Sequence, residues 1–124
     1  MTMGMFYGVG IFVPVSDLKR STEWYKNMLG FEITFNDEPK ATVTMMNDER
    51  IMFCLVQSYD IVPPKFPRND YGVGQYYNFH TTDVQGAHRM LQEKGATVGD
   101  IHDFDGMQGF SLTDPDGNLY GVVN

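Results

Sequence analysis

The sequence of 124 residues contains a single cysteine, Cys54, and only nine basic residues. One cysteine excludes a disulfide bond within the chain and is typical of a reducing, cytoplasmic environment. The formal net charge of -7 argues against nucleic acid as a partner, because binding to phosphates requires a basic face. The apolar runs are also too short to span a bilayer. We therefore expect a cytoplasmic protein with neither nucleic acid nor a membrane as a partner.

The sequence also lacks the composition of a disordered or secreted chain. Its hydrophobic content of 42% and charged content of 20% are ordinary globular values, and its length can bury a core. The apolar segment 1–15 has no basic region and no cleavage site of small residues, as a signal peptide would. Valine and isoleucine alternate with other residues at its end, which predicts a first strand over 9–15.

Residues 13–31 and 79–98 share one pattern, in which a strand, a helix and a glycine follow one another. Each helix starts after an aspartate that can cap it through a side-chain oxygen, and each ends at a glycine suited to a left-handed conformation. The aspartates are Asp17 and Asp83, and the glycines are Gly30 and Gly95. Hairpin signals follow both helices, so the chain is predicted to contain two similar modules.

We place module one at about 5–57 and module two at about 75–124, within one domain that spans 1–124. The linker between them, about 58–74, contains three prolines and two glycines, which exclude a long regular element. Its length is equally compatible with a simple crossover and with a lid over a binding site.

The alternation of side chains along each strand assigns residues to two faces of a sheet. We expect strands over 31–35, 41–46, 51–56, 76–82, 97–101, 107–113 and 119–123, with a polar hairpin loop at 47–50 and a tight turn at Asp114–Asn118. The face opposite the helices then carries Gly10, Phe12, Met52, Cys54, Tyr76, Asn78, His80 and Gly121.

Three segments, in this order and spacing, resemble the vicinal oxygen chelate superfamily of glyoxalases, bleomycin-resistance proteins and extradiol dioxygenases. They are VPVSDLKRSTEWYKNMLGFE at 13–32, TDVQGAHRMLQEKGA at 82–96 and LTDPDGNLYGVV at 112–123. The resemblance covers essentially the whole chain. It implies an α+β fold of two βαβββ modules, whose curled mixed sheets enclose a cleft, and a homodimer.

Metal-using members of the superfamily hold their ion on the cleft face of the first and last strands of each module. The resemblance assigns these ligand positions to Gly10, Cys54, Tyr76 and Gly121 of the present sequence. Two glycines provide no donor, and tyrosine and cysteine are poor substitutes in a hard, open catalytic site. We therefore expect no metal and no other cofactor.

Among the histidines, His80 alone is assigned to the cleft face, where it can contact a ligand or act as a general acid or base. We favour ligand contact or a structural hydrogen bond over catalysis, because the sequence places no carboxylate beside it. His88 on the second helix and His102 in an acidic loop are expected to be structural or exposed. Cys54 is expected to be a small, buried apolar residue rather than a nucleophile.

Our first hypothesis is a metal-independent protein that binds a small molecule, as bleomycin-resistance proteins do. Aromatic residues and negative charge favour an aromatic or cationic ligand. The predicted contacts are Gly10, Phe12, Met52, Cys54, Tyr76, Asn78, His80 and Gly121. One alternative is a glyoxalase-like lyase or isomerase, or a dioxygenase, with a non-standard divalent-metal site that includes His80. Another is a regulatory module that binds a second protein through an exposed apolar patch.

Overall fold

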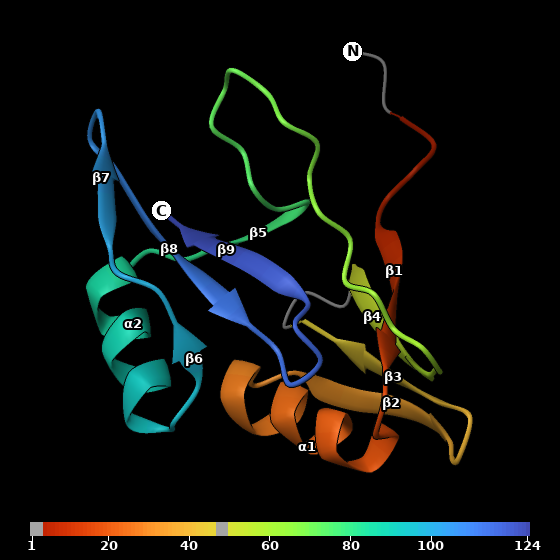
Figure 1. Ribbon diagram of the computed structural model, residues 1–124. Coiled ribbons are helices and arrows are strands. Elements are labelled where there is room, and N and C mark those ends of the chain that lie inside the picture. Colours follow the sequence, from red (N-terminus) through yellow and green to blue (C-terminus); the bar gives the residue numbers. More distant parts are fainter. Residues whose placement is uncertain (1–3, 47–49) are drawn as a thin grey trace. The chain divides into compact units, whose positions relative to one another are not determined.

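The computed structural model describes residues 4–46 and 50–124, which form two compact units, Met1–Ile61 and Val62–Asn124 (Figure 1). Each unit contains a mixed β-sheet and one α-helix, so the expected α+β fold is confirmed. Most of the hairpin loop expected at 47–50 lies outside the described residues. Among the residues that are described, no helix is long and apolar enough to cross a membrane.

The first unit follows the predicted order of one strand, one helix and three strands. Its elements are β1 (Val9–Val15), α1 (Leu18–Leu29), β2 (Glu32–Asp37), β3 (Ala41–Met45) and β4 (Ile51–Gln57). The strands lie in the order β1-β4-β3-β2, and β1 runs parallel to β4. Side chains from the sheet and from α1 form the core: Val13, Val15, Leu18, Tyr25, Phe31, Phe53 and Leu55 are all buried.

The second unit repeats this topology with one additional strand. Its elements are β5 (Tyr77–His80), α2 (Val84–Glu93), β6 (Thr97–Val98), β7 (His102–Phe104), β8 (Met107–Thr113) and β9 (Leu119–Val123). The order β5-β9-β8-β6, with β5 parallel to β9, matches that of the first sheet strand for strand. The prediction of two βαβββ modules is therefore confirmed.

Three of the four residues predicted to start or end the helices do so. The fourth, Gly95, has a φ of 86° but lies one residue beyond Lys94, which caps α2. The carboxylate of Asp17 accepts a hydrogen bond from the backbone N–H of Arg20 at 3.1 Å, and that of Asp83 accepts one from Gly86 at 2.9 Å. Gly30 ends α1 with a φ of 73°, in the left-handed region that glycine adopts at low cost. Local signals thus determine both helices.

The expected turn at 114–118 is built around the buried carboxylate of Asp114. This carboxylate accepts hydrogen bonds from the backbone N–H groups of Asp116 and Asn118 at 2.9 and 2.8 Å, and from the Asn118 side-chain amide at 2.8 Å. Such bonds hold the chain in the turn that leads into β9.

The segment 97–106 differs from the sequence-based expectation. The strand expected over 97–101 ends at Val98, and the acidic loop expected to hold His102 instead contains the strand β7. β7 pairs with β8 through a two-residue turn in which Asp105 and Gly106 have φ values of 48° and 88°. Positive φ at both positions is the type I′ geometry that favours Asp-Gly in hairpins. The loop assignment of His102 was therefore wrong.

Candidate functional site

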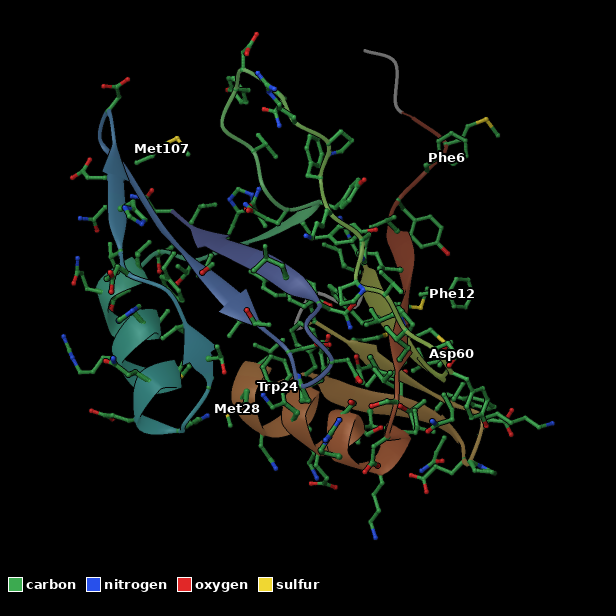
Figure 2. The ribbon with its side chains drawn as sticks, in the orientation of Figure 1. Phe6, Phe12, Trp24, Met28, Asp60 and Met107 are labelled. Atoms are coloured by element: carbon green, nitrogen blue, oxygen red, sulfur yellow. The ribbon has the colours of Figure 1, made fainter. Side chains whose placement is uncertain are left out.

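In the first unit, the four predicted site residues lie together on β1 and β4. Gly10 is paired with Met52, and Phe12 is paired with Cys54, on the sheet face opposite the core. Phe12 belongs to an edge strand and is 79% exposed, and Figure 2 shows its ring projecting away from β1. This face therefore presents apolar groups to solvent.

A pocket of about 350 Å³ lies beside two of these residues, Gly10 and Met52. Methionine and aromatic side chains dominate its wall: Met5, Phe6, Tyr7, Met45 and Met52. Arg50 is the only residue with a formal charge among the described residues that line it. Phe12 and Cys54 lie outside this lining. The first unit thus presents an apolar pocket with one cationic group.

Cys54 has the environment of a structural residue rather than that of a nucleophile. Burial raises the pKa of its thiol, because the surrounding protein disfavours the thiolate. A nucleophilic cysteine requires the opposite shift, which a neighbouring cation or a helix N-terminus produces.

In the second unit, Asn78 and Gly121 are paired across β5 and β9. The side-chain amide of Gln75 donates a hydrogen bond of 2.9 Å to the Asn78 Oδ1 atom. A Cβ atom added to Gly121 would collide with Asn78 Oδ1 and lie 2.7 Å from Gln75 Nε2. The amide pair of Gln75 and Asn78 therefore occupies the space that a side chain at position 121 would need.

The other two predicted residues of this unit flank Asn78. Tyr76 is 49% exposed, and its ring lies 4.9 Å from that of Phe66 between centroids. His80 is exposed at the end of the edge strand β5, beside Val123. Within the described part of the chain, its ring makes no hydrogen bond, so no carboxylate orients it. This arrangement provides no support for a role of His80 as a general base.

A second pocket, of about 260 Å³, lies over the second sheet. Three of its lining residues are glycines, Gly99, Gly109 and Gly121, so backbone atoms contribute much of its floor. The polar lining groups are the side chains of Gln75, Asp100, His102 and Ser111. Of the residues predicted from sequence, only Gly121 lines this pocket, and Asn78 reaches it through its bond to Gln75.

The sequence analysis missed these four polar residues. The Asp-Gly pair at 105–106 could have revealed the hairpin that places His102 beside Gly109. Ser111 could have been assigned to the same sheet face as Gly121, its register partner, by alternation along β8. No sequence signal links Gln75, a loop residue, to Gly121.

The loop before β5 contributes Gly72 and Gln75 to this pocket. The side chain of Asn69 organises it by donating to the carbonyl groups of Pro67 and Val73, both at 2.9 Å. Its carbonyl oxygen accepts hydrogen bonds from the backbone of Tyr71 at 2.9 Å and of Val73 at 3.2 Å. Part of the predicted linker thus forms a structured wall of the second pocket.

His88 has a structural role in the second unit, as expected. Its Nε2 atom lies 2.9 Å from the carbonyl oxygen of Gly99, and its ring packs edge-on against Phe110 at 4.8 Å. These contacts fix the chain at the start of the segment that leads to Asp100 and His102.

The residues at the four positions that the resemblance assigns to metal ligands do not fit a metal ion. Gly10 and Gly121 have no donor atoms, and the amide pair fills the space in which an acidic side chain at position 121 would begin. Among the described residues, no three His, Cys, Asp or Glu side chains gather closely enough to hold a metal. Divalent ions that catalyse reactions in proteins require such convergence.

Solved structures of similar fold cover nearly the whole chain. TnmS3, an antibiotic-binding protein from Streptomyces sp. CB03234, has a TM-score of 0.73 and 23% identity, over 98% of this chain and 96% of its own. Lactoylglutathione lyase from Agrobacterium tumefaciens has a TM-score of 0.71 and 20% identity, over 93% and 90%. An integron cassette protein from the Halifax Harbour sewage outfall has a TM-score of 0.76 and 18% identity, over 98% of both chains. At these identities, the similarity establishes the fold alone.

Comparison of the sequence itself gives the family. No curated protein matches the chain significantly. The profile of the Glyoxalase/Bleomycin resistance protein/Dioxygenase superfamily, however, matches residues 9–122, which include both units. The chain therefore belongs to the Glyoxalase/Bleomycin resistance protein/Dioxygenase superfamily.

Proposed function

We propose that this protein binds a small organic molecule and uses no resident metal ion to do so. The observation that carries the proposal is the amide pair of Gln75 and Asn78 over Gly121. At the position where the resemblance places an acidic metal ligand, the chain has hydrogen-bonding amides instead. Amides bind the polar groups of organic ligands well, and they are weak ligands for transition metals.

Two further observations support binding. Each unit has a pocket, of about 350 and 260 Å³, which is near the lower end of the size range of small-molecule sites. TnmS3, which shares the fold, is an antibiotic-binding protein. A protein of this architecture therefore can serve as a binding protein rather than an enzyme.

The competing hypothesis is an enzyme with a non-standard metal site that includes His80. Lactoylglutathione lyase also shares the fold, so architecture does not separate the two functions. The site residues favour binding, because the enzyme hypothesis requires an oriented base or a set of metal ligands. The described residues provide neither around His80.

The test combines metal analysis with ligand screening on the full-length protein. We would measure the metal content of the purified protein, then titrate nickel, zinc, manganese and ferrous iron while following the melting temperature. A library of small organic molecules would be screened by the same thermal assay in the presence and absence of EDTA. We expect substoichiometric metal, no stabilisation by the ions, and ligand-induced shifts that EDTA leaves unchanged.

The His80→Ala variant decides between the two functions. One tightly bound metal ion per chain that this variant loses would refute the proposal and establish the enzyme hypothesis. Retention of ligand-induced stabilisation in His80→Ala, again without metal, would support binding as the function.

A further inference from the structure

The pocket of the second unit has chemistry that selects among ligands, and its floor is the first part of that chemistry. Gly99, Ser111 and Gly121 lie side by side across neighbouring strands, since Gly99 donates a backbone hydrogen bond to Ser111 at 2.9 Å and Ser111 is paired with Gly121. Adjacent strands are about 4.8 Å apart, so this row spans about 10 Å. Polar groups cover this row, because the Ser111 hydroxyl occupies the space above Gly99 and the amides of Gln75 and Asn78 occupy the space above Gly121.

The hydrogen-bonding groups at this floor include both donors and acceptors. Gln75 uses one N–H of its amide for Asn78, and its carbonyl oxygen and second N–H form no other bond with the described residues. The Ser111 hydroxyl lies against Gly99 and likewise makes no hydrogen bond within the described part of the chain. A ligand with N–H donors, as in an amide or an amidinium, satisfies the carbonyl oxygen of Gln75 and the hydroxyl oxygen of Ser111, which an acceptor-only carboxylate leaves unpaired.

The charge of the lining residues is the third feature by which this pocket selects among ligands. Among the described residues that line it, Asp100 is the only Asp, Glu, Lys or Arg. The described lining of the first pocket has the opposite sign, because Arg50 is its only such residue. A negative group at the rim of the second pocket repels anions and attracts cations, although solvent screens an exposed carboxylate such as Asp100.

We propose that the pocket over Gly99, Ser111 and Gly121 binds a small ligand, neutral or positively charged, that carries an amide or amidine group. This inference rests on the proposed binding function and specifies the chemical class of the ligand. The N–H groups of such a ligand face the carbonyl oxygen of Gln75 and the hydroxyl oxygen of Ser111, and a positive charge faces Asp100. Organic carboxylates are rejected, because they have no donor for these oxygen atoms and meet a like charge at Asp100.

Three probes of nearly identical shape test this class: benzamidine, benzamide and benzoate, which carry positive, zero and negative charge. Binding would be followed by chemical-shift changes in ¹⁵N-labelled protein, which give both the dissociation constant and the location. Molecules of about nine non-hydrogen atoms are expected to bind with dissociation constants of about 10 mM. We expect benzamidine to bind about two- to fivefold more tightly than benzamide, and benzoate to bind most weakly.

Variants identify the groups responsible. Asp100→Asn should remove most of the preference for benzamidine over benzamide, whereas Glu93→Gln, on the exposed face of α2, changes net charge equally and should preserve it. Added salt should weaken binding of benzamidine and leave that of benzamide nearly unchanged. Gly121→Ala should reduce binding of both probes, and the dispersion of its amide signals reports whether it is folded.

The outcomes that contradict this inference differ from those that contradict the proposed function. Tightest binding of benzoate, or equal effects of Asp100→Asn and Glu93→Gln, would overturn the ligand class while leaving small-molecule binding intact. Shifts confined to Met45, Met52 and their neighbours would assign the probes to the first unit and overturn this pocket as their site. No saturable shift from any probe at several times about 10 mM would also overturn the class, even if other ligands stabilise the protein.

Discussion

Replacing Gly121 with alanine tests whether the amide pair occupies the space above it. Gly121 is buried in β9, and the added Cβ atom would collide with Asn78 Oδ1 and lie 2.7 Å from Gln75 Nε2. The amides must then move apart, so their hydrogen bond of 2.9 Å is lost or lengthened. The substitution therefore removes an interaction and crowds the sheet at once.

The expected free-energy change is the difference between three effects. Loss of the amide hydrogen bond costs about 1 kcal/mol, and crowding adds little, because the atoms in the way are the ends of two flexible side chains that can turn aside. Alanine offsets part of this cost by about 0.4–1 kcal/mol, because it restricts the unfolded chain more than glycine does. We expect Gly121→Ala to lower the free energy of unfolding by up to about 1 kcal/mol.

Gly10 of β1, the other glycine at a position that the resemblance assigns to a metal ligand, is the control. A Cβ atom there meets only the flexible end of Met52, with Cε at 3.8 Å. Gly10→Ala is therefore expected to be neutral or to stabilise the protein by up to about 1 kcal/mol. Urea denaturation with a constant m-value measures both changes.

The background Asn78→Ala completes the test, because it removes the atom with which the new Cβ collides. In that background, Gly121→Ala should no longer lower the free energy of unfolding, which a double-mutant cycle detects as coupling between the two positions. Equal effects of Gly121→Ala and Gly10→Ala, or strict additivity with Asn78→Ala, would refute the reasoning.

Three other predictions follow from single side chains. Asp114→Ala removes the acceptor of three hydrogen bonds in a buried turn, so it should lower the free energy of unfolding by about 2–3 kcal/mol in urea denaturation. The control Asp70→Ala, at an exposed loop position, should change this free energy by less than about 0.5 kcal/mol. Ser21→Ala should stabilise the protein by about 1 kcal/mol, because the buried Ser21 hydroxyl has no partner among the described residues. The equivalent position of α2 is already alanine, Ala87. A lower midpoint of unfolding in urea would contradict this prediction. Burial raises the pKa of Cys54, so its thiolate fraction at any given pH is lower than that of a free thiol. The rate of its alkylation by iodoacetamide should therefore rise at higher pH than the rate for free cysteine. A rate profile displaced to lower pH would instead show an activated thiol.

The sequence allowed the helices and most strands to be predicted, because the signals for them are local. Asp17 and Asp83 accept the hydrogen bonds expected of capping residues, and Gly30 takes the left-handed conformation expected of a helix end. Alternation along β1 also correctly separated buried Val13 from exposed Phe12. Such features depend on neighbours within a few residues, so one sequence is sufficient to infer them.

Where the interpretation failed, the missing information was non-local. The strand β7 is short and acidic, and its stability comes from pairing His102 with Gly109 and Phe104 with Met107. The Asp-Gly pair between these strands was the one local signal for the hairpin, and it was read as part of a loop. Without this hairpin, His102 could not be placed at the second pocket.

The amide pair over Gly121 was beyond prediction for a related reason. Alternation placed Asn78 and Gly121 on one face, but it could not reveal that Gln75, a loop residue, would turn its side chain toward them. That orientation depends on the path of the preceding loop, which the side chain of Asn69 holds through four hydrogen bonds. Side-chain direction in loops depends on such tertiary contacts rather than on a periodic pattern.

The two units show how one topology supports different chemistry. Both have the same strand order, and both have glycine at a position that the resemblance assigns to a metal ligand. Gly10, however, lies beside a methionine-rich pocket, whereas Gly121 lies beneath an amide pair. The formal charges at the two pockets, Arg50 and Asp100, are also opposite in sign. Because the strand order is shared, these differences arise from the side chains on each sheet face and from segments outside the shared strands. Those segments are 5–8 at the first pocket, and the β7 hairpin and the loop before β5 at the second. Ligand selection is therefore expected to respond strongly to substitutions at Gln75, Asp100 and Ser111, and weakly to substitutions that alter only the helices.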